Sequence, residues 1–235
     1  MQISSRIRQY DLSPWNLCSN LNFSMDFRLR HFAASYANRN SPLSADVYAF
    51  LGNSAWWIFD VGASDGAKNF IENLDENFCG IKLQKNIIIS HFHQDHCANL
   101  PRLHYDNLFV SKETWKHFHL GTSIEASVEF DDGEKIRILP IPSSHAKGSL
   151  LLCIGRNAFL GDATYPAVGH GTPDRYNVQL LEAQIRFLNA LDVDFFWMSH
   201  KRFVPREKNS VLQFLESVYA TRQPNENWIA VNSDR

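Results

Sequence analysis

The segment from His91 to His96 reads His-Phe-His-Gln-Asp-His, and it constrains the fold more than any other stretch of the chain. It directly follows the largely apolar run 87–90. Alternate residues of an extended strand point to one face, so His91 and His93 share a face, and Asp95 and His96 follow as the chain turns away. All four side chains would crowd one cation, whereas two adjacent cations could share them. The spacing therefore predicts a dinuclear metal site at the end of a strand.

Such a site needs further donors, because zinc takes about four ligands per ion. His145, Asp162 and His200 each end or follow a short apolar run, which is where a sheet-based scaffold presents functional side chains. So dense a group of ionisable side chains would be costly to bury without a cation. The other histidines are interpreted as hydrogen-bonded or surface residues: His31, His104, His117, His119 and His170.

The order of these residues resembles the motif series of the metallo-β-lactamase-fold superfamily of metallohydrolases. That series is an early Asp, then His-x-His-x-Asp-His, then His, Asp and His. Asp60, which ends the run 55–60, supplies the first member. The resemblance extends from about residue 46 to residue 202 and implies a four-layer αβ/βα sandwich.

The resemblance also implies a role for each residue. His91, His93 and His145 would hold one metal ion, Asp95, His96 and His200 the second, and Asp162 would bridge both. Asp60 would not bind metal but would hold the ligand loop by hydrogen bonds. Two zinc ions are expected, with iron or manganese as alternatives, since His and carboxylate donors suit all three. Two adjacent cations can share a water, lower its pKa and hold a hydroxide for attack on a carbonyl.

The substrate is expected to be a small ester-like molecule, either a lactone or a thioester. The sequence Asp-Ala-Thr-Tyr at 162–165 resembles the Asp-Ala-x-Tyr of N-acyl-homoserine lactonases, in which the Tyr165 hydroxyl would assist at the substrate carbonyl. Lys147 would instead bind an anionic tail, as in glyoxalase II-like thioesterases. Tyr165, Asp162 and Asp95 are the predicted catalytic residues. Two alternatives remain: an iron oxygenase resembling mononuclear persulfide dioxygenases, and a metal-binding sensor without turnover.

Composition sets the broader expectations. The 235 residues, 44% of them hydrophobic, suffice for one core, and a single domain over 1–235 is predicted. A net charge of −2 gives no general attraction to nucleic acid or membrane, so a small-molecule substrate is expected, and a homodimer is left open. The N-terminal segment lacks the apolar core of a signal peptide, and the cysteines form no Cys-x-x-Cys pair. A cytoplasmic protein is therefore predicted, with Cys97 a small buried residue behind the ligands.

Hydrophobic periodicity predicts alternating helices and strands in the first half and more strands in the second. A hairpin is expected over 47–51 and 55–60, a helix along Phe70, Ile71, Leu74 and Phe78 that Gly80 ends, and a strand at 86–90. A strand at 108–110 leads into a helix capped near Ser111. Later elements are strands at 126–130, 135–141, 148–154, 158–161 and 195–198, and helices with apolar stripes Val178, Leu181, Ile185, Leu188 and Val211, Phe214, Leu215, Val218. Periodicity alone indicates an α/β or α+β fold, with one or two strands in 1–45 that the pattern cannot place.

Overall fold

Two six-stranded mixed sheets form the centre of the computed structural model, which describes residues 28–36, 38, 41–75, 82–169, 172–200 and 205–231. The first sheet has the order β1-β2-β3-β4-β5-β6. Its strands are β1 (Leu29–Phe32), β2 (Val47–Leu51), β3 (Ala55–Phe59), β4 (Gln84–Ile88), β5 (Asn107–Ser111) and β6 (Thr122–Ile124). The β1-β2-β3 part is antiparallel, and β3 to β6 run parallel.

The second sheet has the order β13-β12-β10-β9-β8-β7. Its strands are β7 (Val128–Asp131), β8 (Lys135–Ile141), β9 (Ser149–Ile154), β10 (Asn157–Gly161), β12 (Phe195–Met198) and β13 (Arg206–Glu207). Neighbouring strands are antiparallel except for the parallel pair β10 and β12. A separate pair of antiparallel strands joins β11 (Asp174–Asn177) to β14 (Trp228–Val231).

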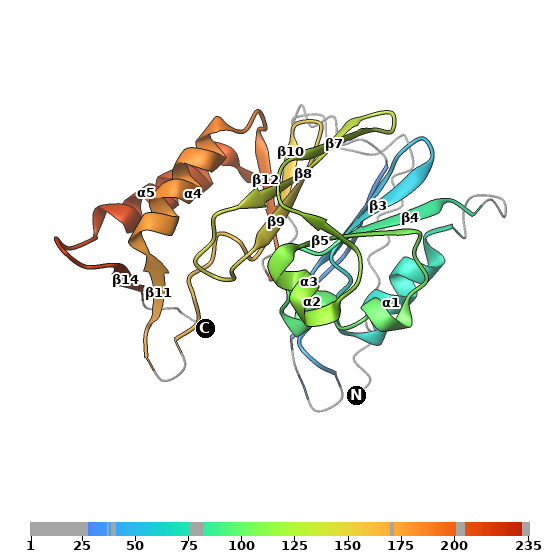
Figure 1. The fold of residues 1–235 in the computed structure, drawn as a ribbon, viewed down its shortest axis with the longest axis horizontal. Coiled ribbons are helices and arrows are strands. Elements are labelled where there is room, and N and C mark those ends of the chain that lie inside the picture. Colours follow the sequence, from blue (N-terminus) through green and yellow to red (C-terminus); the bar gives the residue numbers. More distant parts are fainter. Residues whose placement is uncertain are drawn as a thin grey trace, which may run out of the picture.

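Helices cover the outer faces of both sheets. The helices are α1 (Asp65–Glu72), α2 (Gln94–Cys97), α3 (Lys112–Phe118), α4 (Val178–Ala190) and α5 (Lys208–Ala220), with short 3-10 turns at Asn73–Asp75 and Leu100–Arg102. In Figure 1, α4 and α5 lie on one flank of the sheets, and α1 and α3 lie on the other. Ser64 caps α1 by accepting from the Ala67 N–H, and Ser111 caps α3 in the same way.

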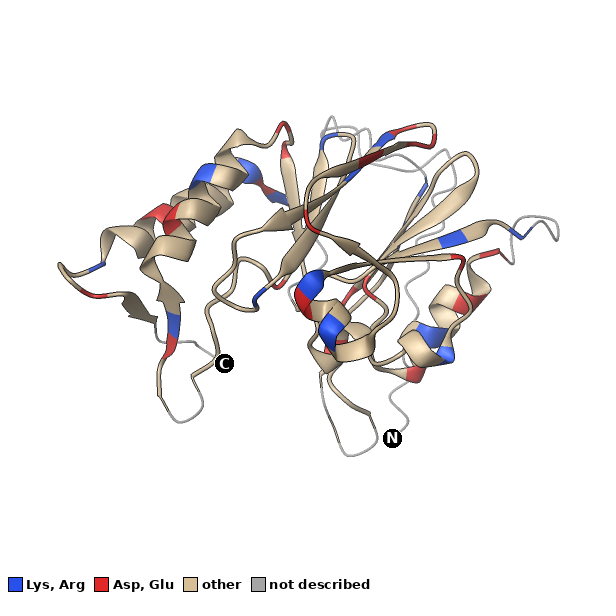
Figure 2. Ribbon diagram, viewed as in Figure 1, with Lys and Arg blue, Asp and Glu red and all other residues tan. Residues whose placement is uncertain are grey.

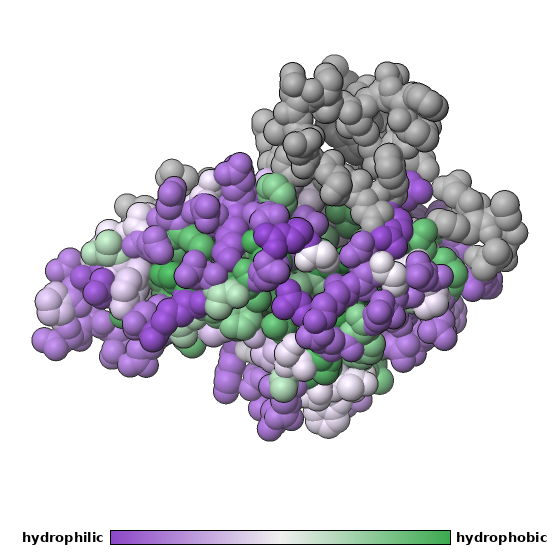
Figure 3. Space-filling view, turned by 90° about the horizontal axis from the view of Figure 1, so that it is seen from above, coloured by the Kyte–Doolittle hydropathy of each residue, from purple (hydrophilic) through white to green (hydrophobic). Residues whose placement is uncertain are grey.

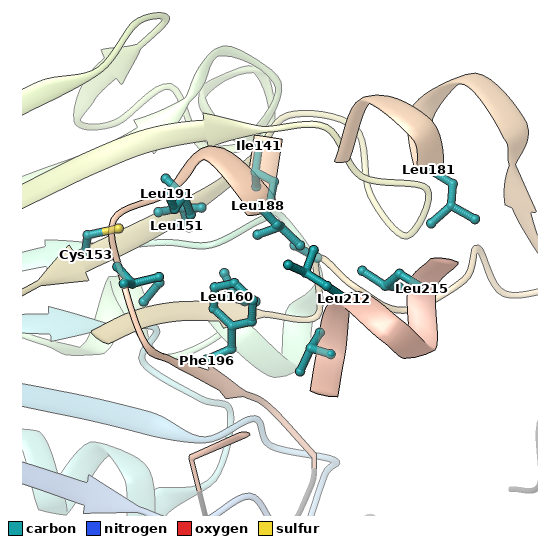
Figure 4. Packing of buried hydrophobic residues seen from close by; sticks show 14 of the residues in the cluster. Ile141, Leu151, Cys153, Leu160, Leu181, Leu188, Leu191, Phe196, Leu212 and Leu215 are labelled. Carbon is teal, nitrogen blue, oxygen red and sulfur yellow. The ribbon is translucent and has the colours of Figure 1, made fainter. Parts of the chain in front are cut away.

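Strand residues alternate between separate hydrophobic layers, as the two-residue period of a strand requires. In β3, Trp57 and Phe59 point between the two sheets, whereas Trp56 and Ile58 point toward the layer beneath α1. In β9, Leu150 and Leu152 face the layer between the sheets, and their neighbours face the helices. Figure 4 shows the latter layer, where Leu151, Cys153, Leu160 and Phe196 lie with Leu188, Leu212 and Leu215 of α4 and α5. Helix, sheet, sheet and helix therefore form the predicted four-layer αβ/βα sandwich.

The structure corrects several predicted elements. The α-helix α1 ends at Glu72 rather than continuing along the stripe to Phe78, because the chain tightens into a 3-10 turn that brings Asp75 to the Trp56 indole, at 2.9 Å. Phe78 and Gly80 lie outside the described residues. In α5, Val211 and Leu215 are buried as predicted, but Phe214 is 57% exposed and was assigned to the stripe wrongly. Leu212 takes the buried place beside Leu215. The predicted strand 86–90 starts and ends earlier, at 84 and 88. Strands β6, β11, β13 and β14 were not predicted.

The surface of the described residues is polar, with charges of both signs. Figure 2 shows Lys and Arg interspersed with Asp and Glu on the helices and connecting segments. On the face drawn in Figure 3, hydrophilic residues surround smaller groups of hydrophobic ones. None of the helices within the described ranges is both long enough and apolar enough to span a membrane.

Candidate metal centre

The predicted ligands all follow the carboxyl ends of strands. His91 and His93 come after β4, His145 after β8, Asp162 after β10 and His200 after β12. Strands β8, β10 and β12 run in one direction, and β3 is parallel to β4, so these ends gather at one edge of each sheet. The structure brings all seven predicted ligands into two adjacent groups of donors.

The first group contains His91, His93 and His145, whose ligand atoms all lie within 4.8 Å of one another. His93 Nδ1 is 2.9 Å from His91 Nε2 and 3.1 Å from His145 Nε2. On its other side, His145 Nδ1 lies 3.1 Å from the Pro166 carbonyl, to which only a protonated nitrogen can donate. The tautomer with its proton on Nδ1 carries a lone pair on Nε2, the atom that faces His93, as a metal ligand requires.

The second group contains Asp95, His96, Asp162 and His200. His200 Nε2 is 2.9 Å from Asp95 Oδ2, and His96 Nε2 is 3.3 Å from Asp162 Oδ2 and 3.5 Å from Asp95 Oδ2. Two donors about 2.1 Å from one tetrahedral zinc ion lie about 3.4 Å apart, so the spacing fits a shared ion. Asp95 and His96 lie on the short helix α2, where the chain turns away from β4.

Asp162 lies between the two groups. Its Oδ2 is 3.5 Å from His145 Nε2 in the first group and 3.6 Å from His200 Nε2 in the second. Burial raises the pKa of Asp162, but the imidazoles of His96, His200 and His145 outweigh burial and lower it to about 2. The carboxylate is therefore anionic near neutral pH, as a ligand between two cations must be.

Among the residues that the structure describes, two buried polar atoms at this site have no hydrogen-bond partner, namely His96 Nε2 and Asp162 Oδ1. Buried polar atoms are nearly always paired, and a metal ion is one way to satisfy them. Burial lowers the pKa of His96, but the carboxylates of Asp162 and Asp60 outweigh it and raise the pKa well above the ordinary value. The pocket thus stabilises positive charge at this ring, and the donor set fits a metal ion.

Asp60 orients the ligand loop from behind. Its Oδ2 lies 2.7 Å from His96 Nδ1 and accepts from the Ser90 hydroxyl at 2.8 Å, and its Oδ1 accepts from the Ser90 N–H at 2.7 Å. A carboxylate facing Nδ1 fixes the tautomer that leaves Nε2 free to bind metal. Asp60 itself has φ 60°, an uncommon conformation for a non-glycine residue.

Comparison with known proteins locates the fold. No protein-family profile matches the sequence, and no curated protein matches it. Among solved structures, a metallo-β-lactamase from Pontibacter korlensis has a TM-score of 0.61 at 12% identity, covering 83% of this chain and 100% of its own. An archaeal metallo-β-lactamase superfamily protein from Sulfolobus tokodaii has a TM-score of 0.57 at 19% identity, covering 88% and 90%. This chain has the metallo-β-lactamase fold.

A further match is a flavo di-iron protein variant from Thermotoga maritima, with a TM-score of 0.58, 16% identity and 74% of this chain covered. The chain spans only about half of that protein, namely 53% of its length. These identities establish the metallo-β-lactamase fold and nothing finer. The glyoxalase II-like and lactonase-like branch stays a prediction.

The two predicted substrate-binding residues, Tyr165 and Lys147, differ in how they are placed relative to the predicted metal ligands. The Tyr165 ring is 6.3 Å from the His145 ring, and its hydroxyl donates to the Ser199 carbonyl next to His200. Burial and the Asp162 carboxylate raise the pKa of Tyr165. Lys147 is exposed, with its Nζ 3.6 Å from Glu113 Oε1. Tyr165 thus lies beside the predicted ligand His145, whereas Lys147 is exposed and already has an anionic partner.

The structure also places residues to which the sequence gave no role at the site. Ser90 directly precedes His91, and its hydroxyl lies 2.9 Å from His91 Nδ1, a contact that adjacency alone could have suggested. Asp46 is 1% exposed and accepts from the His200 N–H at 2.8 Å across 154 positions, which no local pattern reveals. Cys97 is buried, and burial raises the pKa of its thiol to about 12.

Among the remaining histidines, His31 Nε2 lies 2.6 Å from Asp46 Oδ1, and the exposed His117 stacks on Phe92. Neither belongs to the two donor groups. His170 lies outside the described residues.

Proposed function

We propose that this chain is a dinuclear metal-dependent hydrolase of a small ester-like substrate, a lactone or a thioester. The supporting observation is the pair of adjacent donor groups with the Asp162 carboxylate between them. A single closed site needs about four ligands, whereas seven donors converge here.

Zinc is the proposed metal, because neutral imidazole and carboxylate are ligands that it prefers. When bound, a pair of such ions supplies an acidified water as nucleophile and an electrophile for the substrate's carbonyl oxygen. His91, His93 and His145 would hold one ion and Asp95, His96 and His200 the other, with Asp162 shared. Iron is the alternative occupant, and the flavo di-iron relative of the same fold motivates testing it.

The chain's own residues would orient these ligands and recognise the substrate. Asp60 keeps His96 Nδ1 protonated through their 2.7 Å contact, so that Nε2 faces the metal. Tyr165 lies beside His145 and would turn its hydroxyl from Ser199 to the carbonyl of a bound lactone. In the thioester version of the proposal, Lys147 would leave Glu113 and bind an anionic tail. A small-molecule substrate is part of this proposal. The other expectations from the sequence stay predictions: a single domain, a homodimer, a cytoplasmic location and the lack of a nucleic-acid or membrane partner.

Elemental analysis followed by a hydrolase panel tests the proposal. Protein purified without chelator should carry about two transition-metal ions per chain. After zinc loading it should hydrolyse an acyl-homoserine lactone, an acyl-glutathione or an acyl-CoA. One firmly held iron per chain, with no hydrolysis after zinc loading, would overturn the proposal in favour of a mononuclear oxygenase. Two bound ions with no turnover of any substrate in the panel would favour a sensor.

A further inference from the structure

Two consecutive residues, Ala45 and Asp46, connect the backbones of two facing ligands. The Ala45 N–H donates to the Asp95 carbonyl at 2.9 Å, and the Asp46 carboxylate accepts from the His200 N–H at 2.8 Å. The ligands themselves meet at 2.9 Å, between His200 Nε2 and Asp95 Oδ2. The segment 45–46 therefore links the backbones of the two residues whose side chains meet in the second donor group.

This connection crosses between the two sheets. Asp46 directly precedes β2 of the first sheet, and Asp95 follows β4 of the same sheet. His200 follows β12 of the second sheet. A shift of one sheet relative to the other would therefore change the separation of Asp95 and His200. The hydrogen bond that the His200 N–H donates to the Asp46 carboxylate opposes such a shift.

Both oxygens of the Asp46 carboxylate are used. Oδ2 accepts from the His200 N–H and from the Ser199 hydroxyl at 3.2 Å. Oδ1 accepts from the Ala34 N–H at 3.1 Å and lies 2.6 Å from His31 Nε2. In Asn at this position, an amide NH₂ would replace one carboxylate oxygen and would meet a backbone N–H, which is also a donor. Because the side chain is only 1% exposed, water could not easily satisfy these donors.

The backbone of His200 has an uncommon conformation that the bond from Asp46 helps to hold. Its φ is 57°, in the left-handed region. Such a conformation persists only where the surroundings fix it. The Ser199 N–H donates to the Gly161 carbonyl at 3.1 Å, and the Tyr48 hydroxyl donates to the Met198 carbonyl at 3.0 Å. These bonds anchor the residues before His200, whereas Asp46 binds the amide of the ligand itself.

We propose that Asp46 is a positioning residue for the second donor group, setting the place of His200 relative to Asp95 and thereby the metal affinity of that group alone. The proposal rests on the dinuclear centre proposed above. Hydrogen-bond partners outside the ligands typically change metal affinity about 10- to 100-fold when removed. The side-chain hydrogen bonds described for His91, His93 and His145 join Ser90, one another and the Pro166 carbonyl rather than Asp46, so the first group should keep its affinity.

Stepwise zinc titration against a chromophoric chelator tests this in Asp46→Asn, with Asp132→Asn as the matched control. Asp132 is also a buried carboxylate with several hydrogen bonds, but these join Ser54 and Trp57 rather than metal ligands. Wild-type protein should bind zinc in two steps, one at each donor group. In Asp46→Asn we expect the step at the second group to lose about 10- to 100-fold in affinity and the step at the first group to stay unchanged. Cobalt substitution, which gives separate absorption bands for differently ligated ions, assigns the steps. Asp132→Asn should bind both ions as the wild type does while unfolding more easily.

Should Asp46→Asn not fold, Ser199→Ala provides a second test. It removes the bond that the Ser199 hydroxyl donates to the Asp46 carboxylate and the bond that this hydroxyl accepts from the Asp46 N–H, but it keeps the His200 amide bond. This variant should weaken the same step by a smaller factor. The inference is overturned if the variant that folds keeps both wild-type affinities, or if both affinities fall equally. A wild-type chain that binds no zinc would overturn the metal centre itself, and this inference with it.

Discussion

His200 Nε2 lies 2.9 Å from Asp95 Oδ2, although 105 positions separate the two residues and they follow strands of different sheets. Burial lowers the pKa of His200, but the hydrogen bond with Asp95 and the charge of Asp162 outweigh it and raise the pKa. The second donor group is therefore complete only when both sheets are packed together.

Removing metal with a chelator is expected to lower the midpoint of thermal unfolding. An ion that binds only the folded chain stabilises it by mass action, by about 2.7 kcal/mol when its concentration is a hundred times its Kd. Calorimetry before chelation, after chelation and after zinc is restored measures the effect. A midpoint that stays constant through all three steps would contradict metal binding by the folded chain.

Asp162→Asn is expected to reduce metal content from about two ions toward one and to lower kcat about 100-fold or more. The amide keeps the shape of the side chain but removes the charge that balances both cations. Elemental analysis and kinetics on the best substrate of the panel measure the two effects. Asp65→Asn, at a surface carboxylate that is paired with Arg102, is the control and should change neither. Unaltered metal content in Asp162→Asn would argue against its place between the ions.

Tyr165→Phe is expected to lower kcat/KM on lactones by about 10- to 1,000-fold, the range for one donor at a reacting carbonyl. It should also lower the free energy of unfolding by about 1–3 kcal/mol, because the Ser199 carbonyl loses its donor. Tyr176→Phe is a matched control, since the Tyr176 hydroxyl donates to the Thr164 carbonyl at 2.9 Å. If both variants lose stability but neither loses lactone activity, Tyr165 has a structural role only.

Lys147→Ala is expected to raise KM for an anionic thioester and to leave kcat unchanged, as the loss of uniform binding requires. Its effect on stability should be small, because the side chain is 83% exposed. Lys116→Ala is the control, since Lys116 is exposed and lies 3.8 Å from the same Glu113 carboxylate. Equal KM values in the two variants and the wild type would exclude Lys147 from substrate binding.

Asp132 should contribute stability that depends on pH. Burial raises its pKa, but hydrogen bonds from Trp57 and Ser54 outweigh burial and lower it. A carboxyl with a lowered pKa in the folded state stabilises above its unfolded pKa of about 3.9 and loses that contribution as pH falls through the folded value. The free energy of unfolding of the wild type should therefore exceed that of Asp132→Asn by about 1–3 kcal/mol at pH 7, and this difference should narrow below about pH 4. Urea unfolding of metal-free protein from pH 7 to pH 3 measures the difference, and a gap that is constant over this range would refute it.

The sequence predicted which seven side chains converge, because their signal is local or ordered. The cluster from His91 to His96 is contiguous, and Asp162 and His200 each follow an apolar strand that periodicity detects. The two apolar runs on either side of the Gly52-Asn53 turn likewise predicted the hairpin of β2 and β3, with Asp60 at its end. The layered fold followed from the resemblance, which the structural matches confirm at the level of the fold.

What the sequence could not predict depends on contacts between distant residues. Strands β11 and β14 pair across more than fifty residues, and β11, which reads Asp-Arg-Tyr-Asn, has no apolar pattern that would mark it as a strand. Asp46 looks like an ordinary polar residue before a strand, and only the packing of two sheets brings it to the His200 amide. Phe214 has the spacing of a buried helical stripe, but the spacing does not say which face of α5 packs against α4. That packing decides which residues are buried, and it leaves Phe214 exposed.

The alternation in β3 gives the molecule two built-in optical reporters. Trp56 and Trp57 are consecutive, yet the indole of Trp56 donates to Asp75 in the layer beneath α1, and that of Trp57 donates to Asp132 at the edge of the layer between the sheets. Replacing each with Phe in turn would yield two proteins whose fluorescence differs from that of the wild type by one known emitter. Comparing their denaturation curves would show whether the layer beneath α1 and the layer between the sheets unfold in one transition or in two.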